Sequence, residues 1–361
     1  MALSKIQNNS YTDTAVHGQR NLIINGGCVI DQRNNGAAIT SSGYVVDRFH
    51  YQNDSDATLS LQQSSTVPDN FANSISVTVS TADASVGTTQ YSMMTQRIEG
   101  YNIANLGWGT SAAKAVTLSF YVRSSVTGTF GGVLNNSDSS RSYPFTYSIS
   151  SADTWEKKTI TIEGDTSGTW NTTNSSGIQL RWAFGMGSTY VGTAGSWSGN
   201  LYFGASGAVN LISTLNATFY ITGVQLEAGD VATPFEHRSF GDELARCQRY
   251  YEKTYPYATT PGTASSYNTI TALGIAGMDE ETSGQRYITY PWRVEKRTAP
   301  TLTIYDQAGN SGKVTTLDNA GTQTHNVGVG LAFAGTYVMG AGPANSAIWG
   351  LTFFCVGDSE L

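Results

Sequence analysis

Alternation of apolar and polar side chains over long runs is the feature that most constrains this chain. From Val116 to Arg123 every second side chain is large and apolar, and Gly177–Gly187 repeats the pattern. A period of two places alternate side chains on opposite faces of a strand, whereas a helix needs a period near 3.6. The chain is therefore predicted to consist mainly of β-strands. Further runs of this kind are Tyr44–Tyr51, Thr58–Gln62, Ser74–Ser80, Trp155–Glu163 and Thr218–Glu227.

The pattern of Gly177–Gly187 assigns Trp182 to the core and places Gln179 and Arg181 on the opposite face. Loops rich in Gly, Ser and Asn separate the runs, which is typical of an antiparallel β-protein. Charged residues make up only 13% of the 361 residues, against roughly 25% in ordinary soluble domains. Because the common helix formers are scarce, a mostly helical protein is excluded. We predict an all-β fold with a β-sandwich over residues 21–238.

One segment departs from the alternation and predicts a short linker helix over residues 239–255. Ser239 can cap its start, and acidic residues in the first turn suit the helix dipole. Strand-like runs return afterwards, so residues 256–361 are predicted to form a second β-rich domain at the tip. The apolar side chains at helical spacing are Phe240, Leu244, Cys247 and Tyr251.

Several function classes find no support in the sequence. The net charge is −7 and basic residues are not concentrated, so we expect no nucleic-acid partner. No apolar run approaches the roughly 20 residues of a membrane helix. The four histidines and three cysteines are not spaced as metal ligands. The acidic run Asp279–Glu281 could supply paired carboxylates for glycoside hydrolysis, but it is interpreted as a solvated loop. We therefore expect no enzyme activity, no cofactor and no metal.

Several aromatic residues lie in polar, glycine-rich surroundings rather than in apolar stripes. An exposed ring can stack on the apolar face of a sugar while nearby amides bind its hydroxyls. The alternative is that these rings pack loops onto the core, and the sequence leaves both open. The residues are Trp108, Trp170, Tyr190, Trp197 and Tyr202.

Two segments resemble the ends of the jelly-roll sandwiches of carbohydrate-binding modules, and this resemblance implies a jelly-roll β-sandwich over residues 21–238. Asn21–Gly27, with the sequence N-L-I-I-N-G-G, resembles their opening, and Phe219–Leu226 resembles their closing strand. The central pair of strands is matched by Gln96–Glu99 leading into the Val116 run. Members of that family often hold a structural calcium with acidic residues, but the corresponding positions here are Cys28 or Val29 and Thr222. Because calcium prefers several carboxylate oxygens, the calcium site is not expected.

A closer resemblance is to fibre proteins of tailed bacteriophages, especially those of marine bacteria. It covers most of the chain and implies a virion appendage, a homotrimer, that is made in the host cytoplasm and acts on the virion as a tail fibre. The matching segments are Ala2–Ile6 before N-L-I-I-N-G, Ile221–Gly229 as I-T-G-V-Q-L-E-x-G, Ala232–Arg238 as A-T-P-F-E-x-R, Cys247–Tyr251 as C-Q-R-Y-Y, Tyr290–Arg293 and Thr298–Thr301.

From this resemblance we expect residues 1–20 to attach the protein to other virion proteins. The segment is polar, and its apolar residues recur with neither helical nor strand periodicity. Its candidate anchoring residues are Leu3, Ile6 and Tyr11. The apolar stripe of the helix, which comprises Phe240, Leu244, Cys247 and Tyr251, is expected to line a three-fold axis. Packing of that stripe onto a domain of the same subunit is the alternative.

The expected partner is a host cell-surface glycan or protein. Residues after Tyr255 lie farthest in sequence from the attachment segment 1–20, so the candidate receptor-binding residues are Tyr255, Tyr257 and Tyr267. The rival location is the sandwich surface at Trp170 and Trp197. The alternative function is a virion protein of the collar, neck or capsid vertex that binds no receptor. A polysaccharide-degrading spike is disfavoured, because the sequence has neither a repeat-built β-helix nor a convincing acid pair.

Overall fold

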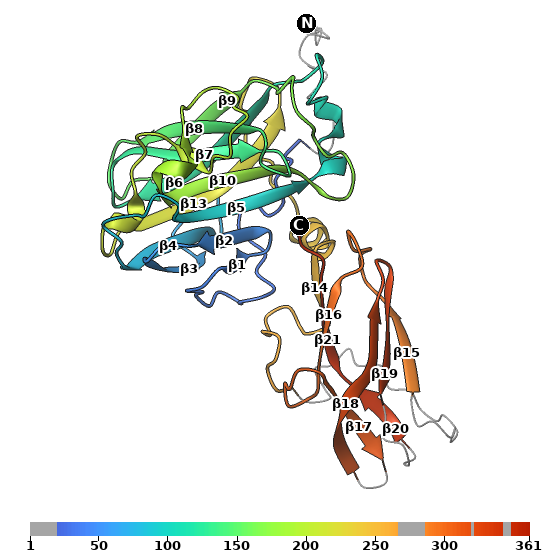
Figure 1. Cartoon of the computed structure of the whole chain (residues 1–361). Helices are drawn as coiled ribbons and strands as arrows, with labels where there is room; N and C mark the ends of the chain where they lie inside the picture. The colour runs from blue at the N-terminus through green and yellow to red at the C-terminus, as the bar shows by residue number, and fades with distance from the viewer. Residues whose placement is uncertain (1–19, 266–285, 319–320, 342–347) are drawn as a thin grey trace, which may run out of the picture. The chain divides into compact units, whose positions relative to one another are not determined.

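The computed structural model (Figure 1) describes residues 20–265, 286–318, 321–341 and 348–361. The candidate anchoring residues Leu3, Ile6 and Tyr11, the acidic run 279–281 and Tyr267 therefore lie outside the described residues. The chain divides into two compact units. The first comprises Met1–Val29, Ala38–Val45 and Phe49–Arg238, and the second comprises Ile30–Ala37, Val46–Arg48 and Ser239–Leu361.

The first unit is a β-sandwich, which confirms the predicted all-β fold class. Successive strands such as β4, β5, β6 and β7 alternate between the two sheets, as in a jelly roll. In spatial order, the six-stranded sheet contains β1 (Gly43–Val46), β2 (Phe49–Asn53), β5 (Tyr91–Glu99), β10 (Ser176–Met186), β7 (Gly128–Asn135) and β8 (Ser142–Ile149). The five-stranded sheet contains β3 (Thr58–Ser64), β4 (Ser74–Thr81), β13 (Thr218–Ala228), β6 (Val116–Ser124) and β9 (Glu156–Ile162).

Short elements connect these strands. They are the 3-10 turns η2 (Gly100–Asn102), η3 (Ala104–Leu106), η4 (Ser188–Tyr190) and η5 (Leu211–Ser213), and the paired strands β11 (Val191–Gly192) and β12 (Gly204–Ala205).

The core lies between the two sheets and is rich in aromatic rings. Trp182 of β10 is fully buried and meets Phe120 of β6 edge to face, with ring centroids 6.0 Å apart. Phe130 and Phe184 both contact Phe219 of β13. Phe120, Trp182 and Phe184 occupy alternate positions that the sequence pattern assigned to one face, whereas Phe130 lies on β7, which is not among the predicted strands. Burying such rings contributes most of the favourable free energy of folding.

The predicted strand Tyr44–Tyr51 is wrong in one respect, because it is interrupted between β1 and β2. Arg48 adopts a left-handed backbone conformation with φ +73°, which an extended strand does not accommodate. Asp47 and Arg48 belong instead to the second unit. Their side chains form polar contacts there, and those contacts explain the break.

Among its described residues, the second unit contains one helix and two sheets. The helix α1 spans Phe240–Gln248 and is capped by the Ser239 hydroxyl, which accepts a hydrogen bond from Asp242 N. The three-stranded sheet is β14 (Tyr251–Lys253), β21 (Phe354–Asp358) and β16 (Thr301–Tyr305). The five-stranded sheet is β15 (Arg286–Pro291), β19 (Thr336–Ala341), β18 (Gly321–Ala332), β17 (Lys313–Asp318) and β20 (Ile348–Thr352).

The predicted linker helix is therefore too long. Tyr251, expected on its apolar stripe, starts β14 and pairs with Asp358 of β21. Long-range strand pairing overrides the local helical spacing at this point. No helix within the described ranges is long and apolar enough to cross a membrane.

The second unit is completed by two loops from the N-terminal part of the sequence. The Arg33 guanidinium lies 3.6 Å from the Tyr251 ring centroid, and Arg48 lies 3.5 Å from that of Tyr250. Glu360 forms ion pairs with both arginines. Residues 256–361 alone, the predicted tip domain, therefore lack part of this unit's buried framework.

Candidate functional site

The outward face of the six-stranded sheet carries a group of polar side chains, called here the polar face. Antiparallel partners share one face of a sheet, so the pairing of Gln179 with both Arg97 and Asn135 sets three of them side by side. Arg181 pairs with Thr95 in the same way. The full set is His50, Gln52, Thr95, Arg97, Asn135, Ser142, Gln179 and Arg181.

The sequence pattern placed Gln179 and Arg181 correctly, opposite the core, but they are not exposed to solvent. Arg181 retains only 5% of its accessible surface. Its guanidinium lies 4.7 Å from the centroid of the Phe203 ring. Phe203 itself stacks on Tyr190 at 4.7 Å and meets Tyr91 edge to face. Half-buried aromatic rings from 187–210 therefore lie against this face.

The hydrogen bonds around Arg181 fix the orientation of the neighbouring amides. Its guanidinium donates to Gln179 Oε1 at 2.6 Å and to Asn135 Oδ1. Gln179 Nε2 donates to Ser137 O at 2.7 Å, and Asn135 Nδ2 donates to Ser142 Oγ at 2.7 Å. Each amide thus presents its oxygen to the guanidinium. Such a preorganised network suits a binding site, because little ordering remains to be done when a ligand arrives.

One donor of this network has no partner. The Arg181 Nε atom is buried and makes no hydrogen bond within the described residues. Burial, followed by the positive charge of Arg97, lowers the pKa of Arg181 to about 9. Arg97 donates to the same Gln179 Oε1 at 3.5 Å. A buried cation whose guanidinium partners are neutral amides, with a second cation beside it, creates a region of positive potential.

Three of the tryptophans in polar surroundings, each on a segment between strands, pack against one another. The ring centroids of Trp108 and Trp170 are 4.6 Å apart, and Trp197 lies 5.5 Å from each of them. Their indole N–H groups donate to the backbone oxygens of Lys114, Ser167 and Glu163. Because Trp170 is buried, the expectation that it offers a free ring to a receptor is wrong. The alternative, packing of loops, accounts for the cluster, in which Trp197 is half-buried.

The tyrosines expected at the tip do not form a stacking surface. Tyr255 is only 1% exposed and lies 4.0 Å from Phe354 in a parallel ring stack, so its assignment as a receptor-binding residue is wrong. Tyr257 is half-buried, and its hydroxyl accepts a hydrogen bond from Asp31 N at 2.9 Å. Burial raises the pKa of Tyr257 to about 12. Both rings stabilise the second unit.

The residues expected at a three-fold axis have different surroundings. Phe240 is 51% exposed and Leu244 is half-buried. Cys247 and Tyr251 are buried within their own unit, so they are wrongly assigned to an interface between copies. Burial raises the pKa of the Cys247 thiol well above its usual range. Phe240 keeps an accessible ring, whose centroid lies 5.3 Å from that of the Tyr257 ring.

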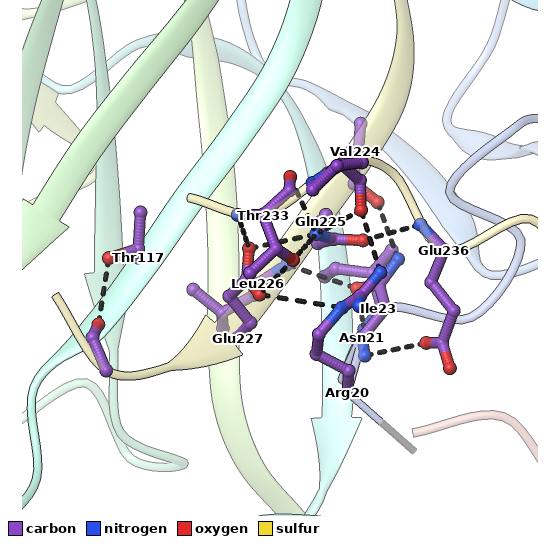
Figure 2. Close-up of polar contacts among 12 residues, drawn as sticks. Arg20, Asn21, Ile23, Thr117, Val224, Gln225, Leu226, Glu227, Thr233 and Glu236 are labelled. Atoms are coloured by element: carbon purple, nitrogen blue, oxygen red, sulfur yellow. Dashed lines mark hydrogen bonds and ion pairs between the residues drawn. The ribbon is translucent and has the colours of Figure 1, made fainter. Parts of the chain in front are cut away.

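The segments that carry the phage-fibre resemblance form a buried polar network around Asn21 (Figure 2). Asn21 Nδ2 donates to Val224 O at 3.0 Å, while its Oδ1 accepts from Ile23 N and Leu226 N. The Asn21 backbone N–H donates to Glu236 Oε2 at 2.8 Å. The start of the sandwich is thus tied to its last strand and to the segment that follows that strand. We call this the Asn21 network.

Acidic and amide side chains extend the Asn21 network. Gln225 Nε2 donates to Glu227 Oε1 at 2.9 Å, and Gln225 Oε1 accepts from Glu236 N. Thr233 Oγ1 donates to Glu227 Oε2 at 2.6 Å. A Cβ at Gly26 would lie 2.1 Å from Val224 O, which explains the glycine in N-G-G. These motif residues therefore hold the fold together and are not arranged to receive a ligand.

The positions that match the calcium site of carbohydrate-binding modules hold no carboxylate. Burial raises the pKa of the Cys28 thiol to about 12, and Thr222 Oγ1 donates to Asn73 O at 2.7 Å. Among the described residues there is no group of three or more His, Cys, Asp and Glu side chains that could hold a metal ion.

Comparison with known proteins gives fold-level likenesses only. No family model and no curated protein matches the sequence. A putative sugar-binding protein of Bacteroides thetaiotaomicron aligns with 58% of this chain and 100% of its own, at 12% identity and a TM-score of 0.34. The family 11 carbohydrate-binding module of a Clostridium thermocellum cellulosomal cellulase aligns with 56% of this chain and 99% of its own, at 11% identity and a TM-score of 0.29.

A third likeness is to the enzymatically active domain of tailspike protein 4 of bacteriophage CBA120. It covers 58% of this chain but only 21% of that one, at 11% identity and a TM-score of 0.31. We draw no function from these likenesses.

Proposed function

We propose that this protein is a host-recognition fibre protein of a tailed-bacteriophage virion whose β-sandwich binds a glycan through the polar face. The observation that carries the glycan proposal is the network across β10 and β7, where Arg181, Gln179 and Asn135 are hydrogen-bonded together beside half-buried aromatic rings. Sugars are recognised by this combination of fixed polar groups and apolar ring surface. The virion assignment rests on the motif resemblance of the sequence.

The geometry suggests how a sugar would be held. Arg97 of β5 and Gln52 of β2 are half-buried, so part of each side chain is accessible to the hydroxyl groups of a sugar. Tyr91, Tyr190 and Phe203 are also half-buried and supply apolar surface for the sugar ring. Single contacts of this kind are weak, and a homotrimer on the virion would gain avidity by presenting three copies.

The test is a glycan array probed with the purified protein, followed by titration of the best glycan. We expect Arg97→Ala to weaken binding about tenfold or more, as loss of a charged hydrogen-bond donor does. Arg123→Ala is the matched control. Arg123 is a half-buried arginine on β6 of the other sheet, where it pairs with Asp153, and its loss should leave the affinity unchanged.

The rival function is a structural virion protein that binds no receptor. It is favoured by the Phe203 ring, which already covers the Arg181 guanidinium. Absence of binding to any glycan on the array, or equal weakening by Arg97→Ala and Arg123→Ala, would contradict glycan binding at the polar face. The mass of the native protein in solution tests the homotrimer separately.

A further inference from the structure

The strongest unexplained feature of the molecule is the uncompensated charge beneath the polar face. Other well-buried arginines have carboxylate partners: Arg48 pairs with Glu360, and Arg238 pairs with Glu236. Arg141 is held by Asp165 through two hydrogen bonds of 2.7 and 2.8 Å. Arg181 forms no ion pair among the described residues, although it is 95% buried.

A buried cation without a counterion is costly, and proteins normally pair such charges. The amide oxygens of Gln179 and Asn135 compensate only in part, because each carries a fraction of a charge. The Nε–H of Arg181 remains without a partner. Arg97 donates to the same Gln179 oxygen as Arg181, so a second positive charge lies beside this unpartnered donor. Together they favour a ligand group that is negatively charged and rich in hydrogen-bond acceptors.

We propose that the polar face selects acidic glycans and holds an anionic substituent, a carboxylate or a sulfate ester, beside Arg97 and Arg181. This rests on the proposed function, whose site it shares. Arg97 is the accessible member of the pair because it is half-buried. An anion bound by Arg97 lies next to the charge of Arg181 and offsets the repulsion between the two guanidinium groups. A neutral sugar leaves that repulsion in place.

The experiment follows the side-chain Nε–H signals of Arg97 and Arg181 in nitrogen-correlated NMR spectra of the full chain. The two signals are assigned by their loss in Arg97→Ala and Arg181→Lys. The probes are glucuronate, glucose 6-sulfate and glucose, which share a ring and differ in charge. We expect saturable shifts with one or both anions and none with glucose. Response to glucuronate alone identifies a carboxylate site, and response to glucose 6-sulfate alone identifies a sulfate-ester site.

A second measurement keeps the proposal testable if Arg181→Lys folds poorly. Arg97→Ala, at a half-buried position, should weaken binding of the anionic probe about tenfold or more, while Arg123→Ala should not. Absence of shifts with both anions, or equal shifts with glucose, overturns the proposal. If neutral glycans still bind on the array in an Arg97-dependent manner, only the acidic specificity fails. If no glycan binds at all, the proposed function fails as well.

Discussion

Asn21→Ala should destabilise the sandwich strongly, although Asn21 is not one of the polar-face residues. The Asn21 side chain is only 3% exposed and makes three hydrogen bonds of 2.9–3.1 Å to backbone groups. Alanine would leave Val224 O, Ile23 N and Leu226 N without these partners. At about 1–1.5 kcal/mol for each lost bond, the expected loss is about 3–5 kcal/mol.

That loss is a large share of the roughly 5–15 kcal/mol by which domains are stable. For a unit of this size, it corresponds to a fall in melting temperature of roughly 10 °C. Urea unfolding followed by tryptophan fluorescence measures it, because Trp182 and the Trp108 cluster lie within the sandwich.

The matched control is Asn105→Ala. Asn105 is exposed on η3, and its side chain makes no hydrogen bond within the described part of the chain, so its replacement should change stability by less than about 0.5 kcal/mol. If Asn21→Ala is as stable as Asn105→Ala, the Asn21 network does not hold the ends of the sandwich together and the structural explanation of the motif is wrong.

Three further predictions concern the second unit. Lys296→Met should cost about 3–5 kcal/mol in urea unfolding, because it leaves the buried Glu252 carboxylate without its ammonium partner 2.5 Å away; adding Glu252→Gln should recover part of the loss, and a neutral single variant would contradict the pairing. Burial lowers the pKa of Lys253 from its ordinary 10.5 to about 8. Between pH 8 and pH 10.5 the unfolded chain therefore binds more protons than the folded chain, and the free energy of unfolding should rise with pH. A Lys253→Met variant should lose that rise, and an unchanged pH profile would refute the assignment. Residues 239–361 expressed alone should show poorly dispersed NMR spectra, because the loop carrying Arg48 is missing; a well-dispersed spectrum would show that the loops are dispensable.

The sequence was sufficient for features that depend on local pattern. Alternation in Val116–Arg123 predicted β6, and Ser239 with its acidic first turn predicted the start of α1. These succeed because side-chain period and capping are properties of neighbouring residues. The end of the helix was missed because Tyr251 pairs with β21, a strand more than a hundred residues later in the chain.

The candidate site was largely missed for a related reason. Polar positions in an alternating strand normally face water, so Gln179 and Arg181 gave no sign of burial. The covering residue Phe203 comes from a glycine-rich loop whose path no local pattern predicts. The available signal was an arginine flanked by Leu180 and Trp182 in an otherwise apolar strand, with no acidic residue nearby in sequence. The opposite error was made for Tyr255 and Trp170. Their rings were predicted to be exposed because the neighbouring sequence is polar, but contacts from distant segments bury them.

The most direct test of the account locates the bound glycan by amide hydrogen exchange. The full chain is compared with and without the tightest glycan from the array. We predict that binding slows exchange in β10, β7 and residues 187–210, which flank the polar face, and leaves β6 and β13 of the opposite sheet unchanged. Protection confined to the five-stranded sheet or to residues 239–265 would contradict the central claim that the polar face is the receptor-binding surface.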